Sequence, residues 1–124
     1  MSIKIEKVGQ INVPVQNIDR AVEFYRDVLD LPFLFRAGNL AFFDCGGTRL
    51  LVDKAEDKEF DHPSSILYFS VSNIEKSFGE LKSRGADIMR DPHMIARLAD
   101  REVWMAFFRD GQGNTHALMS EVKV

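Results

Sequence analysis

Few side chains in this sequence of 124 residues have the chemistry of a catalytic group, and they lie far apart. His93 follows Pro92 in a polar stretch. Because the ordinary pKa of histidine lies near working pH, His93 could act as a general base or as a hydrogen-bond partner of a substrate. An exposed loop histidine is the alternative. His62 lies in a charged linker and is expected to be solvated, and His116 is expected to point toward the helix-covered side of a sheet.

Glu102 and Trp104 stand two positions apart in a strand-like run, so they are predicted to share one face. A carboxylate beside an aromatic wall is a mixture that ligand pockets use. The alternative is an edge-strand glutamate next to a packing tryptophan. Cys45, the single cysteine, ends a strand-like run beside Gly46. Nothing near it in the sequence would lower the pKa of its thiol, so an inert thiol is expected.

The chain repeats part of its own sequence twice, in the same order. Residues 15–21, Val-Gln-Asn-Ile-Asp-Arg-Ala, return as residues 71–77, Val-Ser-Asn-Ile-Glu-Lys-Ser. Residues 41–44, Ala-Phe-Phe-Asp, return as residues 106–109, Ala-Phe-Phe-Arg. A long internal repeat indicates a duplicated structural unit. Two such modules facing each other would form a pseudo-symmetric cavity.

Each module is predicted to contain one strand, one helix and then three strands. In the first module, alternating apolar and polar residues over 8–15 predict a strand, and Asn17 is a suitable N-cap for the helix that follows. In the second module, residues 64–71 predict the first strand and Asn73 caps the helix. The remaining strands are predicted near residues 32–36, 40–45, 48–52, 86–89, 102–109 and 114–120.

The predicted fold is therefore α+β: two βαβββ modules, residues 1–56 and 62–124, forming a pseudo-symmetric open β-sheet cup within a single domain, 1–124. The charged, proline-containing segment 55–63 is expected to link them. Residues 90–101 connect two strands of the second module, and this length is typical of a functional loop. We expect it to be a flap over one end of the cavity.

Composition narrows the classes of partner. The net charge is −3, with both signs interspersed, which argues against nucleic acid or an anionic membrane. No apolar run approaches the roughly 20 residues that span a bilayer, and the N-terminal residues lack the apolar core of a signal peptide. A single cysteine permits no internal disulfide and favours a reducing compartment. A cytoplasmic, soluble protein is expected.

Three segments carry a family resemblance: residues 9–15 (Gly-Gln-Ile-Asn-Val-Pro-Val), 21–29 (Ala-Val-Glu-Phe-Tyr-Arg-Asp-Val-Leu) and 108–114 (Phe-Arg-Asp-Gly-Gln-Gly-Asn). Together with the paired βαβββ plan, they resemble the vicinal oxygen chelate superfamily. That superfamily contains glyoxalase I, bleomycin-resistance proteins, extradiol dioxygenases and methylmalonyl-CoA epimerase. The resemblance covers nearly the whole chain and implies the fold, but not one activity, because the superfamily hosts many chemistries.

The resemblance also implies where a metal would bind. Metal-dependent members take a His or Gln from the first strand of each module and a Glu or His from the last. The corresponding positions here hold Gln10, Leu51, Ile66 and Ala117. Three of these side chains offer no lone pair to a cation, so we expect no metal and no other cofactor at this site. A displaced set of Gln10, His93, Glu102 and Asp53 is the alternative, although no spacing signature supports it.

Two hypotheses about function follow. In the first, the protein resembles the bleomycin-resistance proteins and binds a small organic molecule in the cavity without the family's metal, as a homodimer. The expected ligand-binding residues are Gln10, Asn12, Leu51, Ile66, Trp104, Ala117 and Met119, with His93 at the rim. In the second, it is a lyase, isomerase or dioxygenase that uses a displaced metal or a metal-free general base, His93 or Glu102. A third possibility is a subunit with a vestigial cavity, whose sheet binds a protein partner.

Overall fold

The computed structural model describes residues 3–124, and its first half forms a four-stranded sheet with one helical segment. The strand order is β1-β4-β3-β2, in which β1 runs parallel to β4 and the other pairs are antiparallel. A turn of π-helix, η1, continues directly from α1. The elements are β1 (Gln10–Pro14), α1 (Ile18–Glu23), η1 (Phe24–Val28), β2 (Phe33–Ala37), β3 (Leu40–Cys45) and β4 (Thr48–Asp53).

The second half repeats this plan with strand order β5-β8-β7-β6. A short 3-10 helix, η2, lies in the linker between the halves. The elements are η2 (Lys58–Phe60), β5 (Leu67–Ser70), α2 (Ile74–Ser83), β6 (Asp87–Arg97), β7 (Arg101–Arg109) and β8 (Thr115–Lys123). The prediction of two βαβββ modules is confirmed. No helix among the described residues is both long and apolar enough to cross a membrane.

One prediction about this half is wrong. The segment expected to be a flap, residues 90–101, is mostly the end of β6, which pairs with β7 as far as Arg97. Proline cannot donate to a β-ladder, but β6 is an edge strand, where proline is tolerated. The pairing register shifts across Pro92, between Arg90 and His93, and again beyond it, between Met94 and Ala96. These irregularities absorb the proline without ending the strand.

Both helices begin at the predicted asparagine caps. The Oδ1 atom of Asn17 accepts a hydrogen bond from the Arg20 N–H at 3.1 Å, and Asn73 does the same for Lys76, also at 3.1 Å. Each bond satisfies one of the N–H groups that a helix start leaves unpaired. Gly85, with φ of +83°, follows α2 in a conformation that favours glycine, so the chain turns back toward β6.

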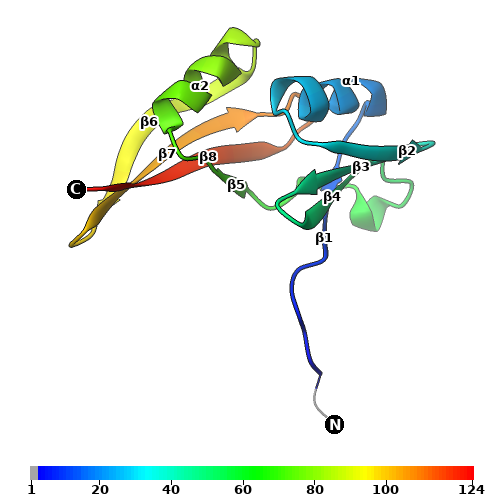
Figure 1. Cartoon of the computed structure of the whole chain (residues 1–124). Helices are drawn as coiled ribbons and strands as arrows, with labels where there is room; N and C mark the ends of the chain where they lie inside the picture. Colours follow the sequence, from blue (N-terminus) through cyan, green and yellow to red (C-terminus); the bar gives the residue numbers. More distant parts are fainter. Residues whose placement is uncertain (1–2) are drawn as a thin grey trace.

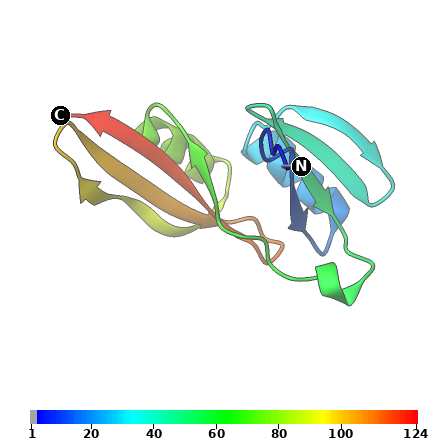
Figure 2. The same cartoon turned by 90° about the horizontal axis from the view of Figure 1, so that it is seen from below.

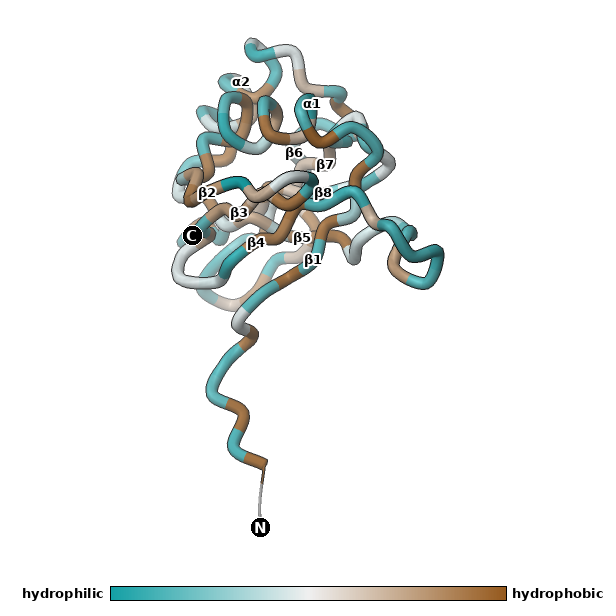
Figure 3. Tube along the Cα trace, turned by 90° about the vertical axis from the view of Figure 1, so that its right-hand side faces the viewer, coloured by the Kyte–Doolittle hydropathy of each residue, from teal (hydrophilic) through white to brown (hydrophobic). Residues whose placement is uncertain are grey.

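The two sheets lie side by side, and both helices cover the same side of them (Figure 1). Seen from below in Figure 2, the other side of each sheet carries no helix. We call these surfaces the helix-free faces. Because side chains alternate along a strand, each strand contributes every second residue to the core and the rest to its helix-free face. Figure 3 shows the apolar residues of the helices turned toward the sheets.

The two modules share apolar contacts near the junction. Phe24, Val28 and Leu29, at the end of the first helical segment, pack against the buried cluster of the second module that includes Phe78 and Phe108. Reciprocally, Leu67 and Phe69 of β5 pack against the core of the first module. The core therefore runs continuously from one module to the other on the helix-covered side.

A buried polar network also crosses this junction. The Tyr25 hydroxyl lies 2.7 Å from Asp110 Oδ2 and 2.8 Å from His116 Nε2. The Asn114 side chain donates to Pro14 O and to Asp110 Oδ2, both at 2.8 Å. Tyr25 and His116 are completely buried, and Asp110 and Asn114 nearly so. Two elements of the first module, η1 and the end of β1, are thus hydrogen-bonded to the turn and strand that end the second.

The network fixes the protonation of His116. The Tyr25 hydroxyl has one proton, which it donates to the Asp110 carboxylate, so it must accept from His116 Nε2–H. Burial lowers the pKa of His116 to about 4, although the Asp110 charge opposes this shift. Burial, with help from Asp110, also raises the pKa of Tyr25 well above its ordinary value. Both groups are therefore neutral at neutral pH.

Replacing Tyr25 with phenylalanine should destabilise the fold. The substitution keeps the ring but removes the hydroxyl, which leaves Asp110 and His116 buried without that partner. The free energy of unfolding, measured by urea denaturation, should fall by about 2 kcal/mol. The matched control is Tyr68→Phe, because Tyr68 is half-exposed on the helix-free face, and it should change stability by less than about 0.5 kcal/mol. Equal effects of the two substitutions would contradict the role assigned to the network.

The free energy of unfolding should also depend on His116 as the pH falls. The unfolded chain protonates this histidine below about 6.5, whereas the folded chain does so only near pH 4. Protons therefore favour the unfolded state between these values, and the stability lost on going from pH 7.5 to 4 is roughly 3 kcal/mol. Urea denaturation of the wild type and of His116→Asn across this range checks the prediction. A constant difference between the two proteins at every pH would contradict it.

Candidate functional site

The helix-free face of the first module gathers three of the predicted ligand-binding residues. Gln10 and Asn12 alternate with core residues on β1, and Leu51 lies beside Asn12 on β4. Phe42 of β3 is the direct neighbour of Leu51 on the other side. Because β1, β4 and β3 are hydrogen-bonded in that order, these side chains form one continuous surface. The alternation over residues 8–15 predicted that Gln10 and Asn12 share a face, and the family resemblance implied that Leu51 lies with them, as the pairing shows.

Arg49, near the start of β4, also lies on this surface, between Gln10 and Phe42, although it was not among the predicted ligand-binding residues. It pairs with Gln10 across β1 and β4, and its Nε–H donates to Gln10 Oε1 at 3.1 Å. Its guanidinium lies over the Phe42 ring, 5.1 Å from the ring centre, within the range of a cation–π contact. Phe42 in turn stacks on Phe35 of β2, with ring centres 4.4 Å apart. The spacing of two between Arg49 and Leu51 is the sequence signal that could have found it.

A hollow of about 740 Å³ adjoins this face where β1 and β4 end. Asn12, Leu40 and Asp53 line its sheet side, and the linker up to Phe60 lines the other. Burial raises the pKa of Asp53, while a hydrogen bond from Asn12 acts in the opposite direction. The Oδ1 atom of Asp53 is buried and has no partner among the described residues. Such an acceptor could receive a hydrogen bond from a ligand.

The helix-free face of the second module is aromatic as well. The rings of Tyr68 and Phe107 meet edge to face, with centres 6.1 Å apart, and His93 lies 6.4 Å from Phe107. Ala117 pairs with both Tyr68 and Phe107 and is fully buried beneath them. Met119 follows on the same strand face, and Ile66 precedes β5 with about half of its surface exposed. Phe42 and Phe107 are equivalent in the sequence repeat, so the two faces are related by pseudo-symmetry.

The structure does not bring Trp104 and Glu102 to either helix-free face. They share one strand face, as predicted, and the Trp104 indole donates to Glu102 Oε1 at 3.1 Å. Trp104, however, packs against the core cluster under α2 and pairs with Ser120, which is buried. Alternation along β7 decides this placement, because Trp104 has the opposite parity to Phe107 and the same parity as the buried Phe108. His93 and Glu102, the two candidate bases, therefore lie on opposite sides of the sheet.

The residues present do not fit the metal that the family resemblance implies. Leu51, Ile66 and Ala117 have no donor atom, and the remaining position, Gln10, already accepts a hydrogen bond from the positively charged Arg49. A second cation at that oxygen would be repelled. No group of three or more His, Cys, Asp or Glu side chains suited to a metal occurs within residues 3–124. The displaced set of Asp53, His93 and Glu102 is therefore not assembled.

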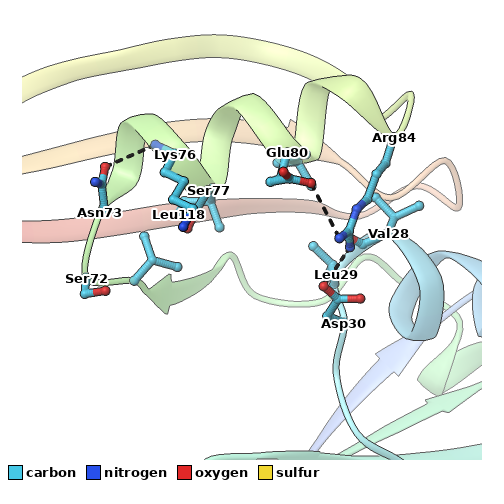
Figure 4. A pocket seen from close by; sticks show the side chains of 12 residues that line it. Val28, Leu29, Asp30, Ser72, Asn73, Lys76, Ser77, Glu80, Arg84 and Leu118 are labelled. Atoms are coloured by element: carbon cyan, nitrogen blue, oxygen red, sulfur yellow. Dashed lines mark hydrogen bonds and ion pairs between the residues drawn. The ribbon is translucent and has the colours of Figure 1, made fainter.

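A second hollow, of about 370 Å³, lies on the helix-covered side, between α2 and the end of η1 (Figure 4). Arg84 crosses it and forms ion pairs with Asp30 at 2.7 Å and Glu80 at 3.6 Å. The same guanidinium donates to the backbone carbonyls of Asp27 and Val28, both at 3.2 Å. Because Arg84 of the second module binds Asp30 and two backbone carbonyls of the first, this hollow contains a second link between the modules.

The comparisons with known proteins decide the family. The sequence model of the Glyoxalase/Bleomycin resistance protein/Dioxygenase superfamily matches residues 7–118. The chain belongs to this superfamily. It is 28% identical to the uncharacterized protein YraH of Bacillus subtilis, over 87% of this chain and 93% of that one. It is also 28% identical to the metallothiol transferase FosB of Shouchella clausii, over 89% of this chain and 77% of that one.

A solved structure supports the glyoxalase-like fold. The lactoylglutathione lyase of Agrobacterium tumefaciens superposes with a TM-score of 0.72 at 18% identity, over 94% of this chain and 95% of that one. The paired βαβββ arrangement of this superfamily member is therefore shared with an experimentally determined structure. At this level of identity the likeness concerns the fold alone.

The thiol of Cys45, at the end of β3, should react slowly. Burial raises its pKa, and the neighbouring Asp44 carboxylate adds to the shift. In alkylation with iodoacetamide at pH 7.5, followed by mass spectrometry, the folded protein should react several-fold more slowly than glutathione, and the rate should rise in urea. A folded-state rate equal to that of glutathione would instead indicate an accessible, activated thiol.

Proposed function

We propose that this protein binds a small organic molecule at its helix-free faces and does so without the superfamily's metal ion. The observation that carries the proposal is the surface formed by Gln10, Asn12, Leu51 and Phe42, in which a few polar groups adjoin exposed apolar and aromatic side chains. Ligand sites commonly have this composition. The hollow beside Asn12, about 740 Å³, has the volume of a small-molecule site.

Exposed apolar side chains on the helix-free faces also support ligand binding there. Large apolar side chains are between about 40% and 50% exposed on both modules, among them Phe35, Tyr68 and Ile66. Contiguous apolar patches on a folded domain mark binding sites more often than single exposed residues do. A ligand lying against Leu51 and Phe42, or against Phe107 and Met119, would remove such area from water. In this proposal, binding alone constitutes the function, as in sequestration.

We also propose a homodimer. The segment before β1 leads away from the two sheets (Figure 1), and its residues Ile3 and Ile5 are 89% and 82% exposed. Apolar side chains at this exposure gain free energy when a second chain covers them. A second copy placed against the helix-free faces would convert two open surfaces into an enclosed site. The ligand would then contact residues of both copies.

The alternative is an enzyme of the same superfamily that uses a metal-free general base. His93 favours it, because it lies beside Phe107 on a helix-free face and its Nδ1 atom is engaged with Asp91 O at 2.9 Å. With a proton on Nδ1, the Nε2 atom is the acceptor and could take a proton from a ligand. Glu102 is a weaker candidate, since its carboxylate is bonded to Trp104 on the other side of the sheet.

Native mass spectrometry before and after chelator treatment tests the proposal. We expect a dimer whose mass does not change with the chelator, because three of the four implied metal positions lack donor atoms. A stoichiometric metal that the chelator removes would contradict the metal-free hypothesis.

Ligand binding can be tested with a matched pair of substitutions. A library of small aromatic and glycopeptide-like compounds is screened by thermal shift, and hits are titrated against Leu51→Gln and Leu98→Gln. Leu51 lies on the proposed surface, whereas Leu98 is exposed in the turn between β6 and β7. Affinity should fall at least about fivefold in the first variant only, which corresponds to roughly 1 kcal/mol. A screen without hits, or equal losses in the two variants, would contradict the proposal.

A further inference from the structure

We propose that Arg49 is the anion-binding residue of the helix-free face, and that the ligand is a planar aromatic molecule carrying a carboxylate. This inference rests on the proposed function, because it names the chemical class that the same surface would bind. Nothing in the sequence comparison assigns a role to Arg49.

The guanidinium is held in a fixed orientation. Its Nε–H donates to Gln10 Oε1, and its plane is placed over the Phe42 ring at 5.1 Å. Two independent contacts therefore restrict a long side chain that would otherwise lose much rotamer entropy on binding a ligand. The neutral amide of Gln10 orients the arginine without neutralising its charge.

The charge of Arg49 is not neutralised by an ion pair. Each of the ion pairs within residues 3–124 involves another basic side chain. Asp44 is its direct neighbour across β3 and β4, but this carboxylate accepts a hydrogen bond from the Gly47 N–H at 3.2 Å and lies outside ion-pair distance of Arg49. The described hydrogen bond uses only Nε, so the Nη side of the guanidinium remains for a ligand. A guanidinium fork binds a planar carboxylate with two parallel hydrogen bonds.

The surface beside Arg49 selects for a flat apolar body. Phe42 and Phe35 stack with an angle of 23° between their planes, and Phe35 is 48% exposed. Leu51 lies next to Phe42 and continues the apolar surface toward Asn12. The flanking strands place Phe35 and Arg49 against opposite faces of the Phe42 ring, so a planar ring would pack on the ring edges and on Leu51 while its carboxylate meets Arg49, because both contacts lie on the same side of one sheet. An aliphatic anion would make only the second contact.

The test uses 2-naphthoate as the probe and its uncharged amide, 2-naphthamide, as the matched compound, titrated by calorimetry against the full-length protein. The wild type should bind the carboxylate at least about tenfold more tightly than the amide. In Arg49→Gln this preference should disappear through weaker binding of the carboxylate. Arg49→Lys should restore part of it, since lysine keeps the charge but lacks the fork. Arg36→Gln is the control, because Arg36 pairs with Asp19 on the helix-covered side.

A second measurement uses only the wild type, so it does not depend on whether the variants fold. In the wild type, NMR signals of the Arg49 Nε–H and the Phe42 ring should shift on adding 2-naphthoate, and those of Tyr25 should not. Equal affinity for carboxylate and amide, or undiminished binding of the carboxylate by folded Arg49→Gln, would overturn the role of Arg49 but leave small-molecule binding intact. Absence of binding by both probes would also overturn it. The proposed function is tested separately: hits from the library screen whose affinity falls in Leu51→Gln would support it even if Arg49 has no role.

Discussion

The hydrogen bond from Tyr25 to Asp110 is the interaction on which the arrangement of this molecule depends. It joins the first helical segment to the turn that precedes the last strand, so it connects the two halves of the sequence repeat. Asp110 also accepts from the backbone N–H groups of Gln112 and Asn114, and Asn114 reaches across to Pro14. A buried carboxylate would be costly without partners, and four donors satisfy this one: the Tyr25 hydroxyl, the two backbone N–H groups and the side-chain amide of Asn114. The result specifies one relative orientation of two sheets that share no backbone ladder.

That orientation has a consequence for binding. With both helices on one side, the apolar contacts and the buried network stabilise the helix-covered half of the molecule. The other side must then present the alternate side chain of every strand. These residues need not complete a core, so their identities are free to serve a ligand. Phe42 and Phe107 occupy equivalent positions in the sequence repeat, and each contacts a second ring on its own helix-free face, Phe35 for the former and Tyr68 for the latter.

The sequence predicted the fold well because its signals are local. Alternation located β1, β3 and β4 to within two residues, and Asn17 and Asn73 marked both helix starts. Two predictions were less successful. Trp104 was grouped with the ligand-binding residues, but it has the same parity along β7 as the buried Phe108, which puts it on the helix-covered side. Residues around Pro92 were predicted as a loop, since the bulges that retain them in β6 exist only through pairing with β7.

Arg49 shows the same limit at the candidate site. Because Arg49 and Leu51 are two positions apart, alternation could have placed Arg49 on the helix-free face. Its hydrogen bond to Gln10, however, depends on the parallel pairing of β1 with β4, which sets the two residues opposite each other. Of the implied metal positions, Gln10 alone retains a donor atom, and it holds a guanidinium instead of a metal ion. A positive charge therefore lies beside Gln10, while the other implied metal positions hold Leu51, Ile66 and Ala117. A guanidinium can attract and orient oxygen atoms, but it is a weaker electrophile than a divalent cation, which agrees better with binding than with metal-type catalysis.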